Sequence, residues 1–429
     1  MNPQPTPPVD EPGRADRWIL LATGLMALAP LALYLRSFRQ MFWFGDEFDL
    51  IDQIDRMGFW HWVCVVFAEN FVPLFKLLWG GAVLVFHGSY FAMILLVWFT
   101  HAAVVVLLGR VMRRCGLPWT ASLFAQVVLA LAPANFETLA WTVQWSALLS
   151  VAFMLAAIDS FLAFPFRRAS YGWVAASALT FSRGVLTGVL LALAAASSAA
   201  AGGFPPARRL RLSAGYLAIA AGVAAVIAAF SSGNHHHMQG HWVEALVYGS
   251  WYYALNPAYR ILGVGSWGWP TAGILGMLKV MLVAWALARS QGRLRLLFAL
   301  LVASDLGNAV LLGVGRYHTG IDTVISSRYQ YASIVGIAPL LGYWITLQAE
   351  RIRVPALVRR AALAGALAAV AVILCLQWRA QIEPFAQARG VESRRVLLLE
   401  PNPGERAVPG IPFMTTVRAR ELIAAYHLH

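Results

Sequence analysis

The sequence predicts an all-α integral membrane protein with about eleven transmembrane helices and a long first external loop. Apolar residues make up 59% of the 429 residues, charged residues make up only 12%, and the mean hydropathy is +0.64. A soluble domain carries roughly 25% charged residues, so this chain has too few to cover a soluble surface. The second observation is that apolar segments alternate with short arginine clusters, which is typical of a multi-span protein.

The formal net charge of +13 points to the lipid bilayer and not to nucleic acid, because the basic residues fall between apolar segments. We expect these clusters on the cytoplasmic side. They lie at 110–114, 167–168, 208–211, 289–295 and 351–360. The three cysteines, Cys64, Cys115 and Cys375, are too scattered for a disulfide framework or a cysteine metal site.

The chain begins with a proline-rich stretch, 1–17, which we expect to be a disordered cytoplasmic tail. A polytopic transmembrane domain follows at 18–378, and 379–429 is expected to be a short periplasmic tail. The predicted spans are 18–34, 89–110, 119–134, 142–163, 171–182, 184–201, 213–231, 270–288, 296–314, 329–348 and 361–378. The use of Arg in place of Lys, with much Ala and Leu, suggests a GC-rich bacterial genome. We expect the chain in the bacterial inner membrane, with its active site facing the periplasm.

The first external loop, 36–88, contains an apolar stretch, Phe71 to His87, that we do not expect to cross. If it crossed, the arginines at 110–114 would move outside, against the positive-inside bias. Because the stretch is short and contains Lys76, it is predicted to be an interfacial or re-entrant helix. The loop is therefore predicted to carry amphipathic juxtamembrane helices.

The segment 171–201 is also irregular, because thirty residues must hold two crossings and the turn that contains Arg183. A 12-residue helix covers only about 18 Å, so this turn should lie below the outer surface. Irregular backbone at that depth is tolerated where it lines a cavity or is covered by protein.

Carboxylates gather at the start of the first external loop, at Asp46, Glu47, Asp49, Asp52 and Asp55. One interpretation is a solvated amphipathic helix whose apolar residues face the membrane. It explains Asp46 and Glu47 less well, because they directly follow an aromatic-glycine corner at the mouth of the first span. A general base needs such a place, desolvated enough to hold a useful pKa and still open to substrate.

The Asp46-Glu47 pair after the first span, and Glu69 shortly before Pro73-Leu74-Phe75, resemble the membrane glycosyltransferases of the C superfamily (GT-C). The pattern is most similar to lipid A aminoarabinose transferases and protein O-mannosyltransferases. The resemblance implies inverting transfer of a sugar from a polyprenyl-phosphate-linked donor to a glycolipid, polysaccharide or protein acceptor at the periplasmic face. It also implies that Asp46 matches the catalytic acid, Glu47 its acidic neighbour, and Glu69 the acid before Pro-Leu.

The chain departs from several of these relatives, which carry Lys and a second Pro where this chain has Asn70 and Val72. Lys76 is a candidate to supply a similar charge in substrate binding. In the second external loop, Glu137 stands where relatives often place another carboxylate. A solvated turn is the alternative interpretation of Glu137.

A lipid-phosphate donor needs cations on the outer side, and the candidates are Arg183, Arg316 and Arg328, with Tyr329 beside the last. Arginine presents a planar fork that suits phosphate oxygens. The alternative for Arg328 is an interfacial arginine that snorkels beside tyrosines of the aromatic belt.

The most metal-like cluster is His235, His236, His237 and His241. Adjacent histidines in a Gly- and Ser-containing loop rarely point at one ion, so an exposed loop is the favoured interpretation, although His237 and His241 have a spacing that suits a helix. We predict no metal site and no cofactor, and leave a divalent cation requirement open.

The main alternative function is a membrane transporter or lipid-linked-sugar flippase, whose decisive charges would lie at the bilayer midplane. Lys279 and Asp305 are such charges, and their equal distance from the cytoplasmic ends of two adjacent spans predicts a buried ion pair. A non-catalytic assembly protein that uses the tail 379–429 is a third possibility.

Overall fold

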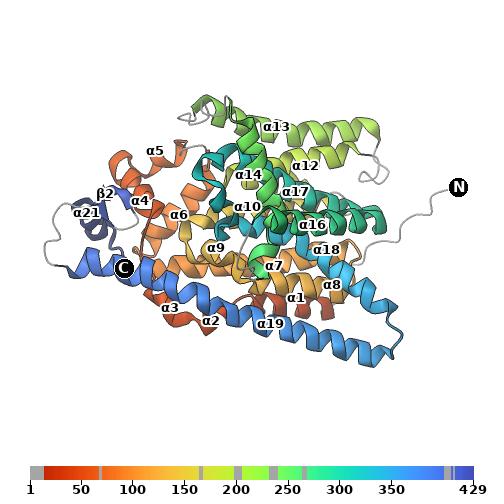
Figure 1. Cartoon of the computed structure of the whole chain (residues 1–429). Coiled ribbons are helices and arrows are strands. Elements are labelled where there is room, and N and C mark those ends of the chain that lie inside the picture. Colours follow the sequence, from red (N-terminus) through yellow and green to blue (C-terminus); the bar gives the residue numbers. More distant parts are fainter. Residues whose placement is uncertain are drawn as a thin grey trace.

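The computed structural model describes residues 14–66, 70–163, 168–197, 205–230, 240–262, 268–400, 407–408 and 411–429. Most of them are helical, as predicted, and they form an elongated bundle (Figure 1). The helices are α1 (Arg14–Met26), α2 (Ala29–Leu33), α3 (Leu35–Gln40), α4 (Asp46–Met57), α5 (Phe59–Cys64), α6 (Pro73–Val85), α7 (Tyr90–Arg114), α8 (Trp119–Leu131), α9 (Phe136–Ala140), α10 (Trp145–Leu162), α11 (Ala169–Ala178), α12 (Val185–Ala196), α13 (Pro206–Phe230), α14 (Trp242–Leu255), α15 (Ala258–Ile261), α16 (Trp269–Arg289), α17 (Gly292–Arg316), α18 (Gln330–Arg351), α19 (Ala356–Ala386), α20 (Glu392–Arg394) and α21 (Thr416–Tyr426). The strands β1 (Ala407–Val408) and β2 (Ile411–Thr415) pair antiparallel.

Seven helices among the described residues are long and apolar enough to cross a membrane, which agrees with a multi-pass protein. They contain α7, α10, α13, α16, α17, α18 and α19. An eighth candidate consists of α8 and the segment Pro133–Ala140, which are bent by 46° relative to one another. The count of about eleven is not reached, because three of the predicted spans fall on shorter helices.

In those three spans the helix is interrupted or short. The first predicted span, 18–34, is divided between α1 and α2, with Pro30 in the first turn of α2. The other two correspond to α11 and α12, of 10 and 12 residues, separated by a 3₁₀ turn at Ser182–Gly184. Only glycine fits at Gly184, since an added Cβ would lie 1.9 Å from the carbonyl oxygen of Ser177.

The first external loop folds into α4, α5 and α6, as the amphipathic pattern predicts. Phe48, Ile51 and Ile54 of α4 are buried against the protein, not against lipid. Gly58 ends α4 with a φ of +78°, a conformation that side-chain-bearing residues rarely adopt. Helix α6 has 13 residues and covers about 20 Å, too short for a bilayer core of about 30 Å, which agrees with an interfacial or re-entrant helix.

Most described residues of the predicted tail, 379–429, belong to helical segments or to the strand pair. Helix α19 does not end at 378, where we expected the last span to end. A helical segment continues through two π-helical turns and α20 to Leu399. After the β1–β2 hairpin, α21 packs beside α4, far from the α18–α19 turn (Figure 1). The strand pair is a small addition to a fold that is all-α, as the sequence predicts.

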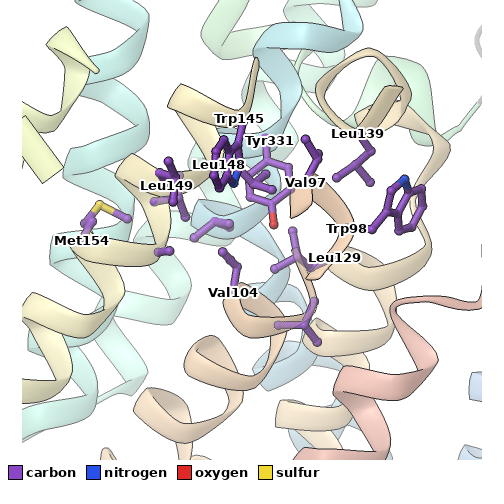
Figure 2. Close-up of a cluster of buried hydrophobic side chains, with 14 of the residues drawn as sticks. Val97, Trp98, Val104, Leu129, Leu139, Trp145, Leu148, Leu149, Met154 and Tyr331 are labelled. Carbon is purple, nitrogen blue, oxygen red and sulfur yellow. The ribbon is translucent and has the colours of Figure 1, made fainter. Parts of the chain in front are cut away.

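The core is built where α7, α8, α10 and α18 meet, around Trp98, Leu148 and Tyr331 (Figure 2). His101 is fully buried, with Nδ1 2.8 Å from the Tyr331 hydroxyl and Nε2 3.2 Å from the Ala130 carbonyl oxygen. In a membrane, helices associate through close packing and small residues. Gly342 follows this rule, because an added Cβ would lie 2.4 Å from the Ala121 carbonyl oxygen on α8.

Different contacts hold the two ends of the bundle. At one end, Asp159 accepts from Arg114 at 2.7 Å and lies 3.2 Å from Arg110. At the other end, the backbone of His429 pairs with Gly88 and Tyr90, so the C-terminus adjoins the first external loop. We refer to the end that carries Arg110 and Arg114 as the arginine-rich end.

Candidate active site

A cavity of about 670 Å³ lies between the segment 46–76, the Ser182–Gly184 turn and the C-terminal ends of α13 and α17. Six residues singled out in the sequence line it. They are Asp46, Lys76, Arg183, Arg316, Arg328 and Tyr329. The volume falls within the range of ligand-binding cavities, so the structure gathers these six around one candidate site.

Asp46 is the first residue of α4 and the carboxylate that α4 presents to the cavity. It follows Gly45, whose φ of +59° turns the chain sharply into the helix. Burial raises the pKa of Asp46 above its ordinary value, and the guanidinium groups of Arg328 and Arg316 partly offset this increase. A half-buried carboxylate of raised pKa that faces a cavity suits a general base.

Glu47 is fully buried and does not line the cavity. Its carboxylate accepts hydrogen bonds from the backbone N–H groups of Phe44 and Thr142, both at 3.0 Å, and from the hydroxyls of Thr142 and Tyr90. Burial raises the pKa of Glu47 to about 8, despite these hydrogen bonds. Glu47, which the sequence analysis named as a catalytic candidate, therefore joins the start of α4 to the segment before α10.

Three arginines reach the cavity from three separate segments. Arg183 lies in the broken segment, where Nη2 donates to the Ala147 carbonyl oxygen at 3.2 Å. Arg316 ends α17, and the Arg328 guanidinium lies 5.0 Å from the ring centroid of Tyr329. Within the described part of the chain, none of the three forms an ion pair with a carboxylate, and the buried Nε of Arg328 has no hydrogen-bond partner. The cavity therefore has an excess of positive charge.

Glu137 supports the segment that carries Arg328 and does not line the cavity. Its Oε2 accepts from the Ser326 hydroxyl and from the backbone N–H of Arg328, both at 3.0 Å. Glu137 is therefore neither part of a solvated turn nor a residue that lines the cavity. It fixes the backbone of Arg328, which is a candidate to bind phosphate.

Lys76 lines the cavity wall, but its ammonium group contacts the protein itself. Nζ donates to the carbonyl oxygens of Trp62 and Val65, each at 2.8 Å, and lies 5.0 Å from the Trp62 ring centroid. These carbonyls belong to the C-terminal end of α5, so Lys76 caps that end of the helix.

Glu69 lies outside the described residues. Its neighbour Asn70 lines the cavity and accepts from the Ser182 N–H at 3.4 Å.

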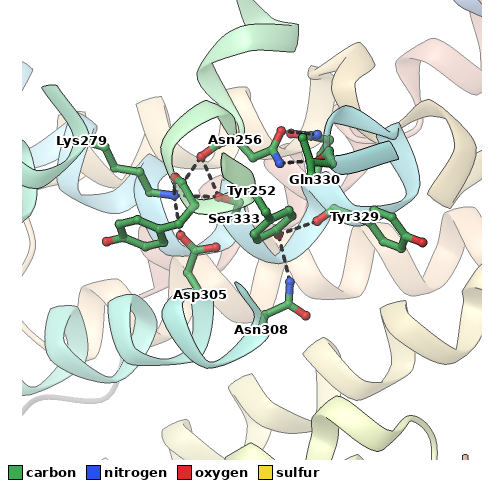
Figure 3. Close-up of polar contacts among 10 residues, drawn as sticks. Tyr252, Asn256, Lys279, Asp305, Asn308, Tyr329, Gln330 and Ser333 are labelled. Atoms are coloured by element: carbon green, nitrogen blue, oxygen red, sulfur yellow. Dashed lines mark hydrogen bonds and ion pairs between the residues drawn. The ribbon is translucent and has the colours of Figure 1, made fainter. Parts of the chain in front are cut away.

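A buried polar network adjoins the cavity (Figure 3). The predicted ion pair is confirmed, since Lys279 Nζ lies 2.7 Å from Asp305 Oδ2. Lys279 also donates to the carbonyl oxygens of Tyr253 and Asn256 and to the hydroxyl of Ser333.

Two amides of this region, Asn256 and Asn308, were missed by sequence reasoning. Asn308, which lines the cavity, donates to the Tyr252 hydroxyl, and Tyr252 donates to the carbonyl oxygen of Tyr329. Gln330 donates to the Asn256 side chain, and the Asn256 backbone carbonyl oxygen accepts from Lys279 (Figure 3). Amide side chains inside apolar segments are the signal that could have found them, because such groups are expensive in a membrane unless bonded.

Of the histidine cluster, only His241 belongs to the described residues. His235, His236 and His237 lie outside the described residues. Nδ1 of His241 lies 3.2 Å from Glu244, and the His241 ring stacks on Tyr317. In the described ranges, no group of three or more His, Cys, Asp or Glu side chains could hold a metal ion.

Comparisons with protein-family models, with curated proteins and with solved structures find no match for this chain. We therefore infer the function from the geometry of the cavity and from the residues that line it.

Proposed function

We propose that the protein is a membrane glycosyltransferase that takes a sugar from a polyprenyl-phosphate-linked donor. The observation that carries this proposal is the presence of one carboxylate, Asp46, in the same cavity as Arg183, Arg316 and Arg328. The reaction needs a base for an acceptor hydroxyl and positive charge for a phosphate leaving group. The cavity holds groups of both kinds.

The apolar part of the cavity supports a lipid-linked donor. Helices α12, α13 and α17 contribute Leu186, Ala224, Ile227, Leu311 and Leu312. The charged residues lie on the segment 46–76, on the Ser182–Gly184 turn, at the last residue of α17 and just before α18. Helices α13 and α17 are candidate spans. A substrate with a phosphate at one end and a hydrocarbon chain at the other matches this division.

In the proposed mechanism, Asp46 accepts the proton of the acceptor hydroxyl. The acceptor oxygen then forms a bond to the anomeric carbon, and the bond from that carbon to the phosphate oxygen breaks. The departing electron pair remains on the phosphate, where Arg328, Arg316 and Arg183 stabilise the negative charge. Direct displacement of this kind inverts the anomeric centre. No step in this mechanism needs Glu47, Glu137 or Lys76 to contact the substrate.

The proposed topology places the cavity at the periplasmic face of a bacterial inner membrane. The three short segments, 18–34, 171–182 and 184–201, then complete the crossings to about eleven. His318 and Arg353 are suitable positions for labelling, since both are exposed and belong to opposite ends of the bundle. In a cysteine-free background, a cysteine at 318 should react from the periplasm and one at 353 only after permeabilisation. The reverse pattern would place the cavity on the cytoplasmic side.

The decisive experiment uses the purified full chain in lipid nanodiscs with a panel of polyprenyl-phosphate sugars. Release of polyprenyl phosphate, lost in Asp46→Asn and retained in Asp49→Asn, would support the proposal. Binding of polyprenyl phosphate alone should weaken in Arg328→Gln and Arg316→Gln but not in Arg353→Gln. Absence of both release and binding would contradict the proposal.

The transporter alternative depends on Lys279 and Asp305. Besides its ion pair with Asp305, Lys279 Nζ donates to three acceptors of the protein, and this favours a structural role for the pair. Movement of a lipid-linked sugar across proteoliposome membranes without turnover would instead support a flippase.

A further inference from the structure

A second cavity, of about 450 Å³, lies at the arginine-rich end, away from the candidate active site. Arg168, at the start of α11, and Arg208 and Arg211, in the first turns of α13, line it. Tyr171 and Leu212 add an aromatic and an apolar wall. Cations from two helices therefore face one space.

The frame around this cavity is tightly packed. The ring centroids of Tyr171 and Tyr216 lie 4.7 Å apart, and the Ser170 hydroxyl lies 2.7 Å from the Tyr216 hydroxyl. An added Cβ at Gly215 would lie 2.7 Å from the Tyr171 ring. These contacts hold α11 against α13, so the spacing between Arg168 and Arg211 is set before any ligand binds.

The charge around the cavity favours an anion. The sequence contains no Asp or Glu between Asp159 and Glu244. Asp159, the nearest preceding acid in the sequence, is paired with Arg110 and Arg114. Helix α13 begins at Pro206, so the positive end of its dipole lies beside the cavity.

The position of the cavity indicates which anion. Helix α13 is a candidate span that begins at Pro206, so Arg208 and Arg211 lie at the membrane boundary, where lipid headgroups are found. Leu212 and Tyr171 suit the glycerol and first methylene groups of a lipid. We propose that this cavity binds the phosphodiester headgroup of an anionic phospholipid of the facing leaflet. The proposal does not depend on the proposed function.

The test measures lipid binding to the full chain in nanodiscs that contain phosphatidylglycerol or phosphatidylcholine, by native mass spectrometry. We expect phosphatidylglycerol to be retained preferentially. Arg168→Gln and Arg211→Gln should each weaken retention about fivefold, the usual effect of one basic residue near an anionic surface. Their matched controls are Arg353→Gln and Arg360→Gln, which are exposed at the same end and distant in sequence from the cavity, and these should have little effect.

Three results would overturn the proposal. The first is equal retention of both lipids, and the second is an equal loss in the control variants, which would indicate general surface charge. The third is displacement of phosphatidylglycerol by millimolar glycerol 3-phosphate, which would assign the cavity to a soluble phosphate ester. Thermal unfolding of each variant, measured in detergent, checks that the loss is not due to unfolding.

Discussion

Arg418 of α21 lies 2.7 Å from Asp52 and 2.6 Å from Asp55, both on α4. The same guanidinium lies 3.0 Å from Glu421, so one arginine joins three carboxylates. Because α4 begins with Asp46, these contacts connect the C-terminal helix to the helix that carries the candidate base. Helix α21 therefore supports the helix that carries Asp46.

We expect Arg418→Gln to loosen α21 and to lower turnover severalfold. An exposed ion pair is worth about 0–1 kcal/mol, but loss of a guanidinium shared by several carboxylates also leaves like charges on α4. Limited proteolysis should cleave the C-terminal region faster in this variant. Arg395→Gln is the control, since the pair of Arg395 with Glu392 is exposed and lies within one helical segment. Equal effects of the two changes would contradict a role for α21 in the site.

Asp46→Asn should reduce turnover by about 10²–10⁴, the usual effect of removing a general base, and leave donor binding largely unchanged. The pKa of Asp46 is raised, and the base must be deprotonated to act. Activity should therefore fall as the pH drops through that raised pKa, above the ordinary value near 4. Turnover measured from pH 4 to 8 tests this. Near wild-type turnover in Asp46→Asn would remove the residue from the mechanism.

The charged residues of the cavity could be singled out from the sequence because each is a rare charge in an apolar chain. Asp46, Arg183, Arg316 and Arg328 stood out in this way. That they lie around one cavity could not be predicted, because they are far apart in the sequence. The role of Glu47 could not be predicted, since it depends on Thr142, which is remote in the chain.

The C-terminal region shows the same limit. Contacts between Arg418 and Asp52 join residues separated by almost the whole chain, and no local pattern marks them. The number of crossings was also hard to predict, because hydropathy does not report where helices break. Turns such as Ser182–Gly184 are set by contacts with neighbouring helices.

Glu47 should make the protein less stable as the pH rises from about 4.5 to about 8. Its pKa is raised to about 8 in the folded protein, so the folded state retains a proton that the unfolded chain releases near its ordinary pKa of about 4.3. Stability should fall with pH through this window, by at most about 1.4 kcal/mol per pH unit, and the loss is complete above the folded pKa. Thermal unfolding at several pH values should show this slope in the wild type and not in Glu47→Gln. A persistent slope in the variant would assign it to another group.

Removal of either partner of the Lys279–Asp305 pair should destabilise the protein more than removal of both. The pair is buried, with side chains only 6% and 1% exposed. Breaking such a pair leaves an uncompensated buried charge and costs about 3–5 kcal/mol. The measurement is a double-mutant cycle, in which thermal unfolding of Lys279→Ala, Asp305→Ala and the double variant is compared with that of the wild type. Additive losses would show that the two charges do not stabilise one another.

Arg328→Lys should weaken donor binding about tenfold, since it keeps the charge but loses the planar fork. The backbone of Arg328 is held by Glu137, and its guanidinium lies over Tyr329, so the side chain is oriented before the donor binds. Its buried Nε has no hydrogen-bond partner, and a phosphate oxygen would supply one. A charged hydrogen bond is worth about 1.5–3 kcal/mol, which agrees with a tenfold or larger effect.

The measurement is binding of polyprenyl phosphate to the purified full chain, with Arg353→Lys as the control. Arg316→Lys should have a smaller effect, since no contact of comparable geometry orients its side chain among the described residues. If Arg328→Gln binds polyprenyl phosphate as the wild type does, Arg328 is an interfacial arginine beside tyrosines. Its buried Nε would then reflect packing alone, and the leaving phosphate would have to be stabilised by Arg316 and Arg183.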